Sequence, residues 1–368
     1  MAYTTIDDSS KYYQTKIYCG TGSSQSLVND GNSDLQPDLV WFKGSSGGDN
    51  RIMDSSRGVT KYLPTNLDAA ESTGTNYIDS FDSDGYSIDS GDGSSNTNGN
   101  KYMGWQWKIN GGTTTTNSDG NRDVTLQANA DAGISIMLYE GSGADGATYG
   151  HGLGAVPDMV IMKNRDSGNR DWIVWHSSIS PAYGQFLDGS SAKFTGGGGK
   201  FQTFTSSVIA LESWSEVNIA ESFMALAFTS IEGYSKFDIF EGSDPSNYET
   251  NANGTFVYCG FKPAFVMYKP VDSTGSWLMF DNKRNKIASG VGANYNGNTI
   301  WSRLAADIPD EESASTDNFI DFLSNGFQIK LDDATLADSY HDDGELYIFA
   351  AFAEQPFITS SGVPCTAV

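Results

Sequence analysis

The stretch Pro37-Asp38-Leu39-Val40-Trp41-Phe42-Lys43 occurs in two further versions, Pro157-Asp158-Met159-Val160-Ile161-Met162-Lys163 and Pro263-Ala264-Phe265-Val266-Met267-Tyr268-Lys269. Each version has a proline, a small or acidic residue, four apolar residues and a lysine. Four consecutive bulky apolar residues are typical of a strand buried on both faces, and they are too few for a stable helix. Proline is tolerated at the first residue of a strand. The motif therefore predicts one doubly buried strand in each of three repeats.

Other landmarks recur in the same order around the motif, which makes a chance likeness a poor explanation. Glycine-containing turns precede it, and an aromatic strand closes each repeat (102–107, 223–228 and 347–352). Abundant Gly, Ser, Thr, Asn and Asp indicate many turns and little helix. The expected fold is all-β, with three tandem antiparallel β-sandwich repeats of jelly-roll or concanavalin-like type. The expected segments are an N-terminal arm (1–16), repeat 1 (17–108), a linker (109–130), repeat 2 (131–230), repeat 3 (231–357) and a C-terminal tail (358–368). An ordinary first strand is the alternative to the arm.

Composition limits the kinds of partner. The chain has 368 residues and a formal charge of −24, from 46 acidic and 22 basic residues. Such a surface repels phosphate backbones, so we expect no nucleic-acid binding. No apolar run has membrane-spanning length, and the first residues do not have signal-peptide character, so we expect no membrane insertion. Three cysteines at non-equivalent positions indicate free thiols and assembly in a cytoplasm.

A second repeated feature is an Asp-x-x-Arg pair after the motif. Asp54 and Arg57 form it in repeat 1, and Asp281 and Arg284 form it in repeat 3. We interpret the pair as a strand-end ion pair or hydrogen bond that holds a sandwich corner. His176 occupies the aspartate position of the middle repeat, which argues against a role as a catalytic base. With no Gly-x-Ser-x-Gly elbow, the sequence predicts no catalytic or cofactor-binding residues.

Carboxylates crowd the first repeat near Gly85, which we expect in a turn that needs positive φ. Their spacing does not match an EF-hand loop, so a Ca²⁺ site is the alternative to a simple turn. The middle repeat has Val208 at the glycine position and needs a different turn. The carboxylates concerned are Asp79, Asp82, Asp84, Asp89 and Asp92.

The remaining histidines and the tryptophans have mostly structural interpretations. His151 is expected to bind the backbone in a turn, and His341 to lie at a polar hairpin tip, where it is weak evidence for a metal. Most tryptophans fall in the shared strand pattern and are expected in the cores. Trp214 and Trp301 lie outside that pattern and are candidate contacts for a glycan or a protein partner.

Several strings resemble a family of repeat-bearing virion proteins of marine tailed bacteriophages. They are 1–6, 36–41, 151–154, 232–237, 322–327 and 351–357, and the likeness covers nearly the whole chain. The resemblance implies a virion structural component without established enzymatic chemistry. This sequence departs from it at Val208 and near Trp301, where binding specificity is expected to differ.

On this basis we expect a non-enzymatic, surface-exposed tail or fibre protein that contributes to host attachment, assembled in the host cytoplasm and released by lysis. A capsid-decoration or head-fibre protein, which stabilises the capsid or adheres to surfaces, is the alternative. A polysaccharide-degrading tail enzyme is a third interpretation, because the carboxylate separation needed for glycoside hydrolysis is a three-dimensional quantity. Expected partners are other virion proteins and a host surface glycan or protein, with a homotrimer as the expected oligomer.

Overall fold

The structure is a computed structural model in which, among the described residues, the regular elements are strands apart from two short 3-10 helices at Ser9–Lys11 (η1) and Ser177–Ile179 (η2). It describes the chain apart from residues 1–2, 91–93, 180, 196–199, 244–252, 285–298, 301, 315–319, 331–343 and 366–368. We divide the strands into units 1, 2 and 3, because one strand order occurs three times.

The strands of unit 1 are β1 (Tyr13–Cys19), β2 (Gln25–Leu27), β3 (Leu39–Gly44), β4 (Arg51–Asp54), β5 (Lys61–Pro64), β6 (Ser72–Thr73), β7 (Ile78–Asp82), β8 (Gly85–Ile88) and β9 (Lys101–Trp107). Those of unit 2 are β10 (Thr115–Asn117), β11 (Val124–Asn129), β12 (Ile134–Glu140), β13 (Ala147–Gly150), β14 (Met159–Asn164), β15 (Ile173–His176), β16 (Tyr183–Phe186), β17 (Phe194–Thr195), β18 (Val208–Leu211) and β19 (Ser222–Phe228). Those of unit 3 are β20 (Ser235–Glu241), β21 (Asn253–Tyr258), β22 (Phe261–Pro270), β23 (Leu278–Asp281), β24 (Thr299–Ile300), β25 (Ser302–Ala305), β26 (Ser313–Ala314), β27 (Ile320–Leu323), β28 (Gly326–Lys330) and β29 (Leu346–Pro356).

Each unit pairs one large and one small antiparallel sheet. The large sheets have the orders β1-β9-β3-β4-β5-β6, β10-β11-β12-β19-β14-β15-β16-β17 and β20-β29-β22-β23-β25-β26. The small sheets have the orders β2-β8-β7, β13-β18 and β21-β28-β27-β24. The three copies of the motif, in β3, β14 and β22, each lie between the last strand of the unit and the strand that follows the motif. The motif therefore has one topological position in all three units.

The motif strands are buried on both faces because each face belongs to a different core. In β3, Val40 and Phe42 pack inside unit 1, whereas Leu39 and Trp41 join a core shared by all three units. β14 and β22 divide their apolar residues between the two cores in the same alternating way. Alternate residues of a strand point to opposite faces, so four consecutive apolar residues serve two cores at once. This explains why the motif lacks the polar alternation of an exposed sheet.

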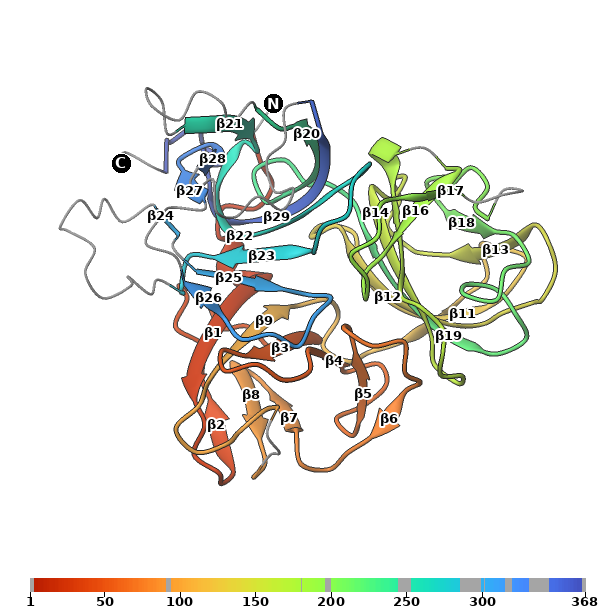
Figure 1. Cartoon of the computed structure of the whole chain (residues 1–368), viewed down its shortest axis with the longest axis horizontal. Coiled ribbons are helices and arrows are strands. Elements are labelled where there is room, and N and C mark those ends of the chain that lie inside the picture. Colours follow the sequence, from red (N-terminus) through yellow and green to blue (C-terminus); the bar gives the residue numbers. More distant parts are fainter. Residues whose placement is uncertain are drawn as a thin grey trace.

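The three large sheets face one another around the shared core. Figure 1 shows unit 1 (red to orange) at the bottom, unit 2 (yellow to green) on the right and unit 3 (cyan to blue) at the upper left. Each unit contributes a fully buried tryptophan to this shared core: Trp105 from unit 1, Trp172 from unit 2 and Trp277 from unit 3. A small apolar cavity of about 20 Å³ lies at the centre, lined by residues of all three units. The units thus form one packed body.

The interpretation of 109–130 as a linker without regular structure is wrong. Residues 115–117 and 124–129 form β10 and β11 at the edge of the large sheet of unit 2. Val124 and Leu126 are buried while Thr125 between them is exposed. This alternation is typical of a half-buried strand. Of the two interpretations of residues 1–16, an attachment arm or an ordinary first strand, the structure shows the strand: the segment includes η1 and the start of β1, which pairs with β9.

The turn that precedes the last strand of the small sheet is built differently in units 1 and 2, as expected. Gly85 has φ of 99°, and a Cβ atom there would lie 2.0 Å from the Leu27 carbonyl oxygen. In unit 2 the Thr205 hydroxyl accepts a hydrogen bond from the Val208 N–H at 3.1 Å. A side-chain hydroxyl therefore stabilises the turn that has valine in place of glycine.

Candidate functional site: the seams between the three units

We call the three contacts between neighbouring units the seams. Equivalent residues are fixed by strand register, because Asp54, His176 and Asp281 each pair with the first apolar residue of their motif strand. Three sets of equivalent residues build the seams. The first two sets connect unit 2 to unit 1, unit 3 to unit 2, and unit 1 to unit 3, and the third crosses two of these seams.

The first set is a side-chain donor placed four residues before the aspartate or histidine position. Trp172 Nε1 of unit 2 donates to the Pro64 carbonyl of unit 1 at 2.8 Å. Trp277 Nε1 of unit 3 donates to the Phe186 carbonyl of unit 2, also at 2.8 Å. In unit 1 the equivalent Asn50 donates through Nδ2 to the Ala306 carbonyl of unit 3 at 2.8 Å. Buried donors thus find a partner across every seam.

The second set consists of backbone hydrogen bonds that extend each seam. In each seam one main-chain N–H donates to a carbonyl of the neighbouring unit: Arg170 to Asp68 (3.2 Å), Gly275 to Ser190 (2.8 Å) and Gly48 to Pro309 (2.8 Å). A second main-chain N–H in each seam donates in the opposite direction: Glu71 to Arg165 (2.9 Å), Lys193 to Val271 (2.7 Å) and Glu312 to Ser45 (2.8 Å). Because the third seam leads back to unit 1, these head-to-tail contacts close into a ring with threefold pseudosymmetry.

The third set is the lysine that ends each motif, and all three lysines are fully buried. Lys43 Nζ donates to the Ile308 carbonyl at 2.7 Å, and Lys269 Nζ to the Gly189 carbonyl at 2.9 Å, both across a seam. Lys163 Nζ donates to a carbonyl of its own unit, that of Arg170. Burial lowers the pKa of each ammonium group to about 8. The lysines therefore bind main-chain carbonyls at the seams, whereas a lysine at the end of an apolar run usually indicates a solvated strand end.

Carboxylates near these lysines were missed by the sequence analysis. Asp188 and Asp307 accept hydrogen bonds from the main-chain N–H groups of Trp172 and Trp277, each at 3.1 Å. Burial, with the charge of Asp171, raises the pKa of Asp188 to about 7. Burial also raises the pKa of Asp307. Asp188 precedes β17 and Asp307 precedes β26, the edge strands of their large sheets, so the two aspartates are equivalent. Insertions in unit 3 hide this equivalence in the sequence.

The repeated Asp-x-x-Arg residues form the pairs that the sequence predicts. Arg57 Nε is hydrogen-bonded to Asp54 Oδ2, and the Arg57 N–H donates to Asp54 Oδ1 at 2.9 Å. Arg284 repeats both contacts with Asp281, at 2.6 and 2.9 Å. The four side chains are almost completely buried. Asp281 also accepts a hydrogen bond from Trp105 Nε1 of unit 1 at 3.1 Å, so this pair takes part in the seam between units 3 and 1.

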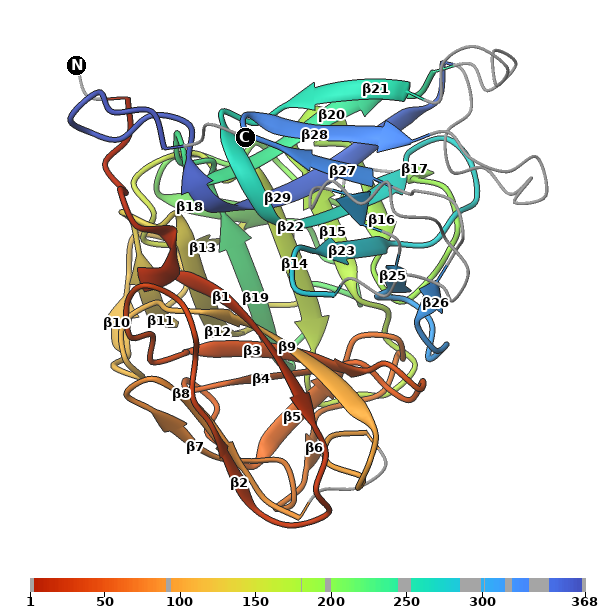
Figure 2. The same cartoon turned by 90° about the vertical axis from the view of Figure 1, so that its left-hand side faces the viewer.

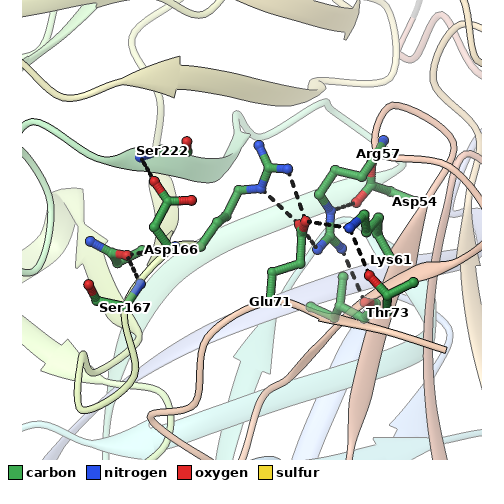
Figure 3. Close-up of polar contacts among 11 residues, drawn as sticks. Asp54, Arg57, Lys61, Glu71, Thr73, Asp166, Ser167 and Ser222 are labelled. Carbon is green, nitrogen blue, oxygen red and sulfur yellow. Dashed lines mark hydrogen bonds and ion pairs between the residues drawn. The ribbon is translucent and has the colours of Figure 1, made fainter.

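Glu71 extends the pair of unit 1 into a network across the seam with unit 2 (Figure 3). Its carboxylate lies 3.0 Å from Arg57 and 2.8 Å from Arg165 of unit 2. Burial alone would raise the pKa of Glu71, but hydrogen bonds from Arg165 and the charges of both arginines lower it below its ordinary value. In unit 3 the equivalent Glu312 lies 3.6 Å from Arg284.

The middle unit replaces the whole ionic set with other residues. His176, Ile179 and Lys193 stand where unit 1 has Asp54, Arg57 and Glu71. Burial lowers the pKa of His176 to about 4, so its imidazole is neutral at pH 7, and Nδ1 accepts a hydrogen bond from the Ser178 N–H at 3.2 Å. Ile179 joins the shared core. Lys193 instead pairs with Asp272 of unit 3 at 2.6 Å.

The two tryptophans predicted as partner contacts have different outcomes. Trp214 is half-buried against the core of unit 2, and its ring lies edge-on to Phe194 and Phe201. The Lys200 ammonium lies 3.7 Å from its ring centroid and covers one face by a cation–π contact. Trp301 lies outside the described residues. A role of either residue in binding stays a prediction.

The carboxylates near Gly85 make local hydrogen bonds. Asp82 accepts from the hydroxyls of Ser80 and Ser87 at 2.6 and 2.7 Å, and Asp89 accepts from Ser24 at 2.7 Å. Within the described part of the chain, no group of three or more potential metal ligands is brought together. The Ca²⁺ alternative stays untested, and Asp92 falls outside the described residues.

Of the two remaining histidines, His151 occupies a turn as predicted. It is buried, its Nε2 lies 3.1 Å from the Thr205 carbonyl oxygen, and its Nδ1 accepts a hydrogen bond from the Leu153 N–H at 3.2 Å. His341 lies outside the described residues. Among the residues that are described, no helix has the length and apolarity to span a membrane.

Fold and seams together define the chain as a single-chain ring of antiparallel β-sandwiches around a shared core. The chain belongs to the family described as Domain of unknown function (DUF7483), whose model matches residues 8–356. That range includes every strand from β1 to β29 and all three seams. Neither a curated protein nor a solved structure matches the chain.

Proposed function

We propose that the chain is a non-enzymatic structural protein of a bacteriophage virion, exposed on the tail or fibre, where it contributes to host attachment. The closed ring is the observation that carries this proposal. Its large sheets face inward and are joined by buried donors and ion pairs, while its small sheets and connecting loops face outward. An attachment protein needs such a rigid body with variable outer loops, because recognition residues are commonly placed on loops held by a scaffold.

The resemblance to virion proteins of marine tailed phages supports the same proposal. The charge of −24 supports a surface role as well, because like charge keeps copies of the protein apart at the high local concentration of an assembly. Assembly would take place in the host cytoplasm with other virion proteins, followed by release on lysis.

The test is the location of the protein in an intact particle, by cryo-electron microscopy combined with gold-labelled antibodies. Density at the tail tip, baseplate or fibres is the expected result. Absence of the protein from purified virions would overturn the proposal. Release of reducing sugar from host envelope by the purified chain would overturn its non-enzymatic part and favour a tail depolymerase.

A capsid-decoration protein is the second candidate, and the threefold pseudosymmetry of the ring is the observation that favours it. Head lattices contain threefold positions, and a ring of three similar units presents similar surfaces to three neighbours there. Density over such positions of the head would establish this alternative. A homotrimer, the oligomer expected from the sequence, is tested separately by the mass of the chain in solution.

A further inference from the structure

The outer face of the small sheet of unit 3 exposes two aromatic side chains. Phe256 and Tyr258 on β21 are 43% and 52% exposed, whereas Val257 between them is buried in the core of unit 3. Their side chains therefore point away from the sandwich on the same side of the strand. Figure 2 places β21 at the upper surface of the molecule, away from the shared core.

The fold does not require aromatic residues at these positions. Register aligns Val257 with Leu27 of unit 1 and Tyr149 of unit 2. Each pairs with the residue that follows the equivalent turn position, which is Gly326, Gly85 or Val208. The positions of Phe256 and Tyr258 are then filled by Ser26 and Val28 in unit 1, and by Thr148 and Gly150 in unit 2. Two units fold without aromatic side chains there, so packing does not account for the two rings of unit 3.

Polar groups surround the two rings. The Tyr258 hydroxyl lies 3.3 Å from that of Tyr3, and Tyr3 donates to the Gly260 carbonyl at 2.7 Å, which restrains the outer end of the Tyr258 ring. Gln328 pairs directly with Phe256 on β28, so its amide lies on the same face of the sheet. The two ring-bearing residues are two apart along the strand, or roughly 6.6 Å. The result is a short aromatic platform with hydroxyl and amide groups at its sides.

We infer that this platform, made of Phe256, Tyr258 and the neighbouring Gln328 amide, binds the apolar face of an uncharged glycan. This inference deepens the proposed attachment function and rests on it. The exposed parts of the two rings amount to roughly 200 Å², because an aromatic side chain presents about 150–250 Å² in total. A stable protein interface buries about 800 Å² per partner, so the two rings alone would supply only about a quarter of one.

Charge selects between kinds of glycan. The protein carries a formal charge of −24, which repels sulfated or strongly acidic polysaccharides. An uncharged sugar has no such penalty, since its C–H face lies on the rings while its hydroxyls hydrogen-bond to Tyr258 and Gln328. The expected ligand is therefore a neutral hexose polymer or a neutral surface glycan.

Affinity electrophoresis of the full chain, in native gels that contain dextran, laminarin or mannan, tests the inference. The double variant Phe256→Ser with Tyr258→Val copies the residues of unit 1, so it should fold with an unchanged circular dichroism spectrum. We expect the wild type to be retarded in at least one neutral gel, and the double variant to lose about tenfold in apparent affinity. Val156→Ser removes an exposed apolar side chain elsewhere and should migrate like the wild type.

Equal retardation of the wild type and the double variant in every neutral gel would overturn the inference, as would a complete lack of retardation. Retardation by heparin alone would overturn it as well, since heparin is a polyanion. The location of the protein in the virion is a separate measurement. A virion protein without glycan binding would thus disprove this inference while leaving the proposed function in place.

Discussion

Replacing Arg57 with isoleucine should destabilise the protein strongly, because it leaves a buried carboxylate without its cation. The Asp54 and Arg57 side chains are both fully buried, and Arg57 also donates to Glu71 at 3.0 Å and to the Ile52 carbonyl at 3.1 Å. Removal of one partner of a buried ion pair costs about 3–5 kcal/mol, much of it the desolvation of the remaining charge. The Arg57→Ile variant should therefore lose about that much free energy of unfolding.

The middle unit supplies the compensating change. His176 and Ile179 occupy the same two positions there, with a neutral imidazole and no buried charge pair. Adding Asp54→His to Arg57→Ile removes the orphaned carboxylate, so the double variant should be more stable than the single variant by about 2 kcal/mol. Urea unfolding at pH 7.5, followed by tryptophan fluorescence, measures both differences.

Lys61→Met is the control for this cycle. Lys61 lies 3.9 Å from Glu71 but is 39% exposed, so its loss should change the free energy of unfolding by at most about 1 kcal/mol. A cost below about 1 kcal/mol for Arg57→Ile would refute the reasoning that the buried pair is an obligatory unit. The Asp54→His single variant completes the cycle, and a double variant whose loss equals the sum of the two single losses would also refute the reasoning.

Three further predictions concern the seams. The pKa of Lys269 is about 8 in the folded chain against an ordinary 10.5, so between these pH values the unfolded chain binds more protons than the folded chain. The free energy of unfolding should therefore rise from pH 8 to pH 10.5, and the urea midpoint of Lys269→Met should rise less over the same range. His176 has a folded-state pKa of about 4 against 6.5, so part of the stability should be lost as pH falls through this window, and His176→Gln should reduce that loss in thermal melts. Trp277→Phe keeps most of the buried ring but leaves the Phe186 carbonyl without its donor, so urea unfolding should show a loss of about 1–3 kcal/mol; a loss near zero would mean that the bond contributes nothing.

The sequence was informative wherever a local pattern has a single structural meaning. Four apolar residues in a row cannot alternate with solvent, so Leu39 to Phe42 predicted a doubly buried strand, and its two faces contact two cores. The recurrence of Asp54 and Arg57 in unit 3 predicted an ion pair from spacing alone. In contrast, the 124–129 strand was missed because threonine-rich and glycine-rich neighbours hid a short alternation.

The seams could not be derived from the sequence, because their partners come from different units. Trp172 gives no indication along the chain that its indole N–H donates to the Pro64 carbonyl of another unit. Lysine at the end of a strand is usually solvated, and only the neighbouring unit turns Lys43 and Lys269 into buried donors. The junction at 231–237 is too short for a linker and predicts close docking of units 2 and 3, but no local pattern indicates that unit 1 closes the ring; the free faces of the large sheets need a partner and find it in each other.

The substitutions of the middle unit show that seam residues change as a set. If the aspartate, arginine and glutamate positions were independent, one altered position would leave a buried charge unpaired in unit 2. Instead the aspartate is a neutral histidine, the arginine is a core isoleucine, and the glutamate is Lys193, paired with Asp272 across the next seam. Each seam therefore satisfies its own charges, and the ring tolerates different chemistry at different seams as long as every buried charge keeps a partner. The backbone hydrogen bonds, which do not depend on side chains, are the part of the seam that all three units share.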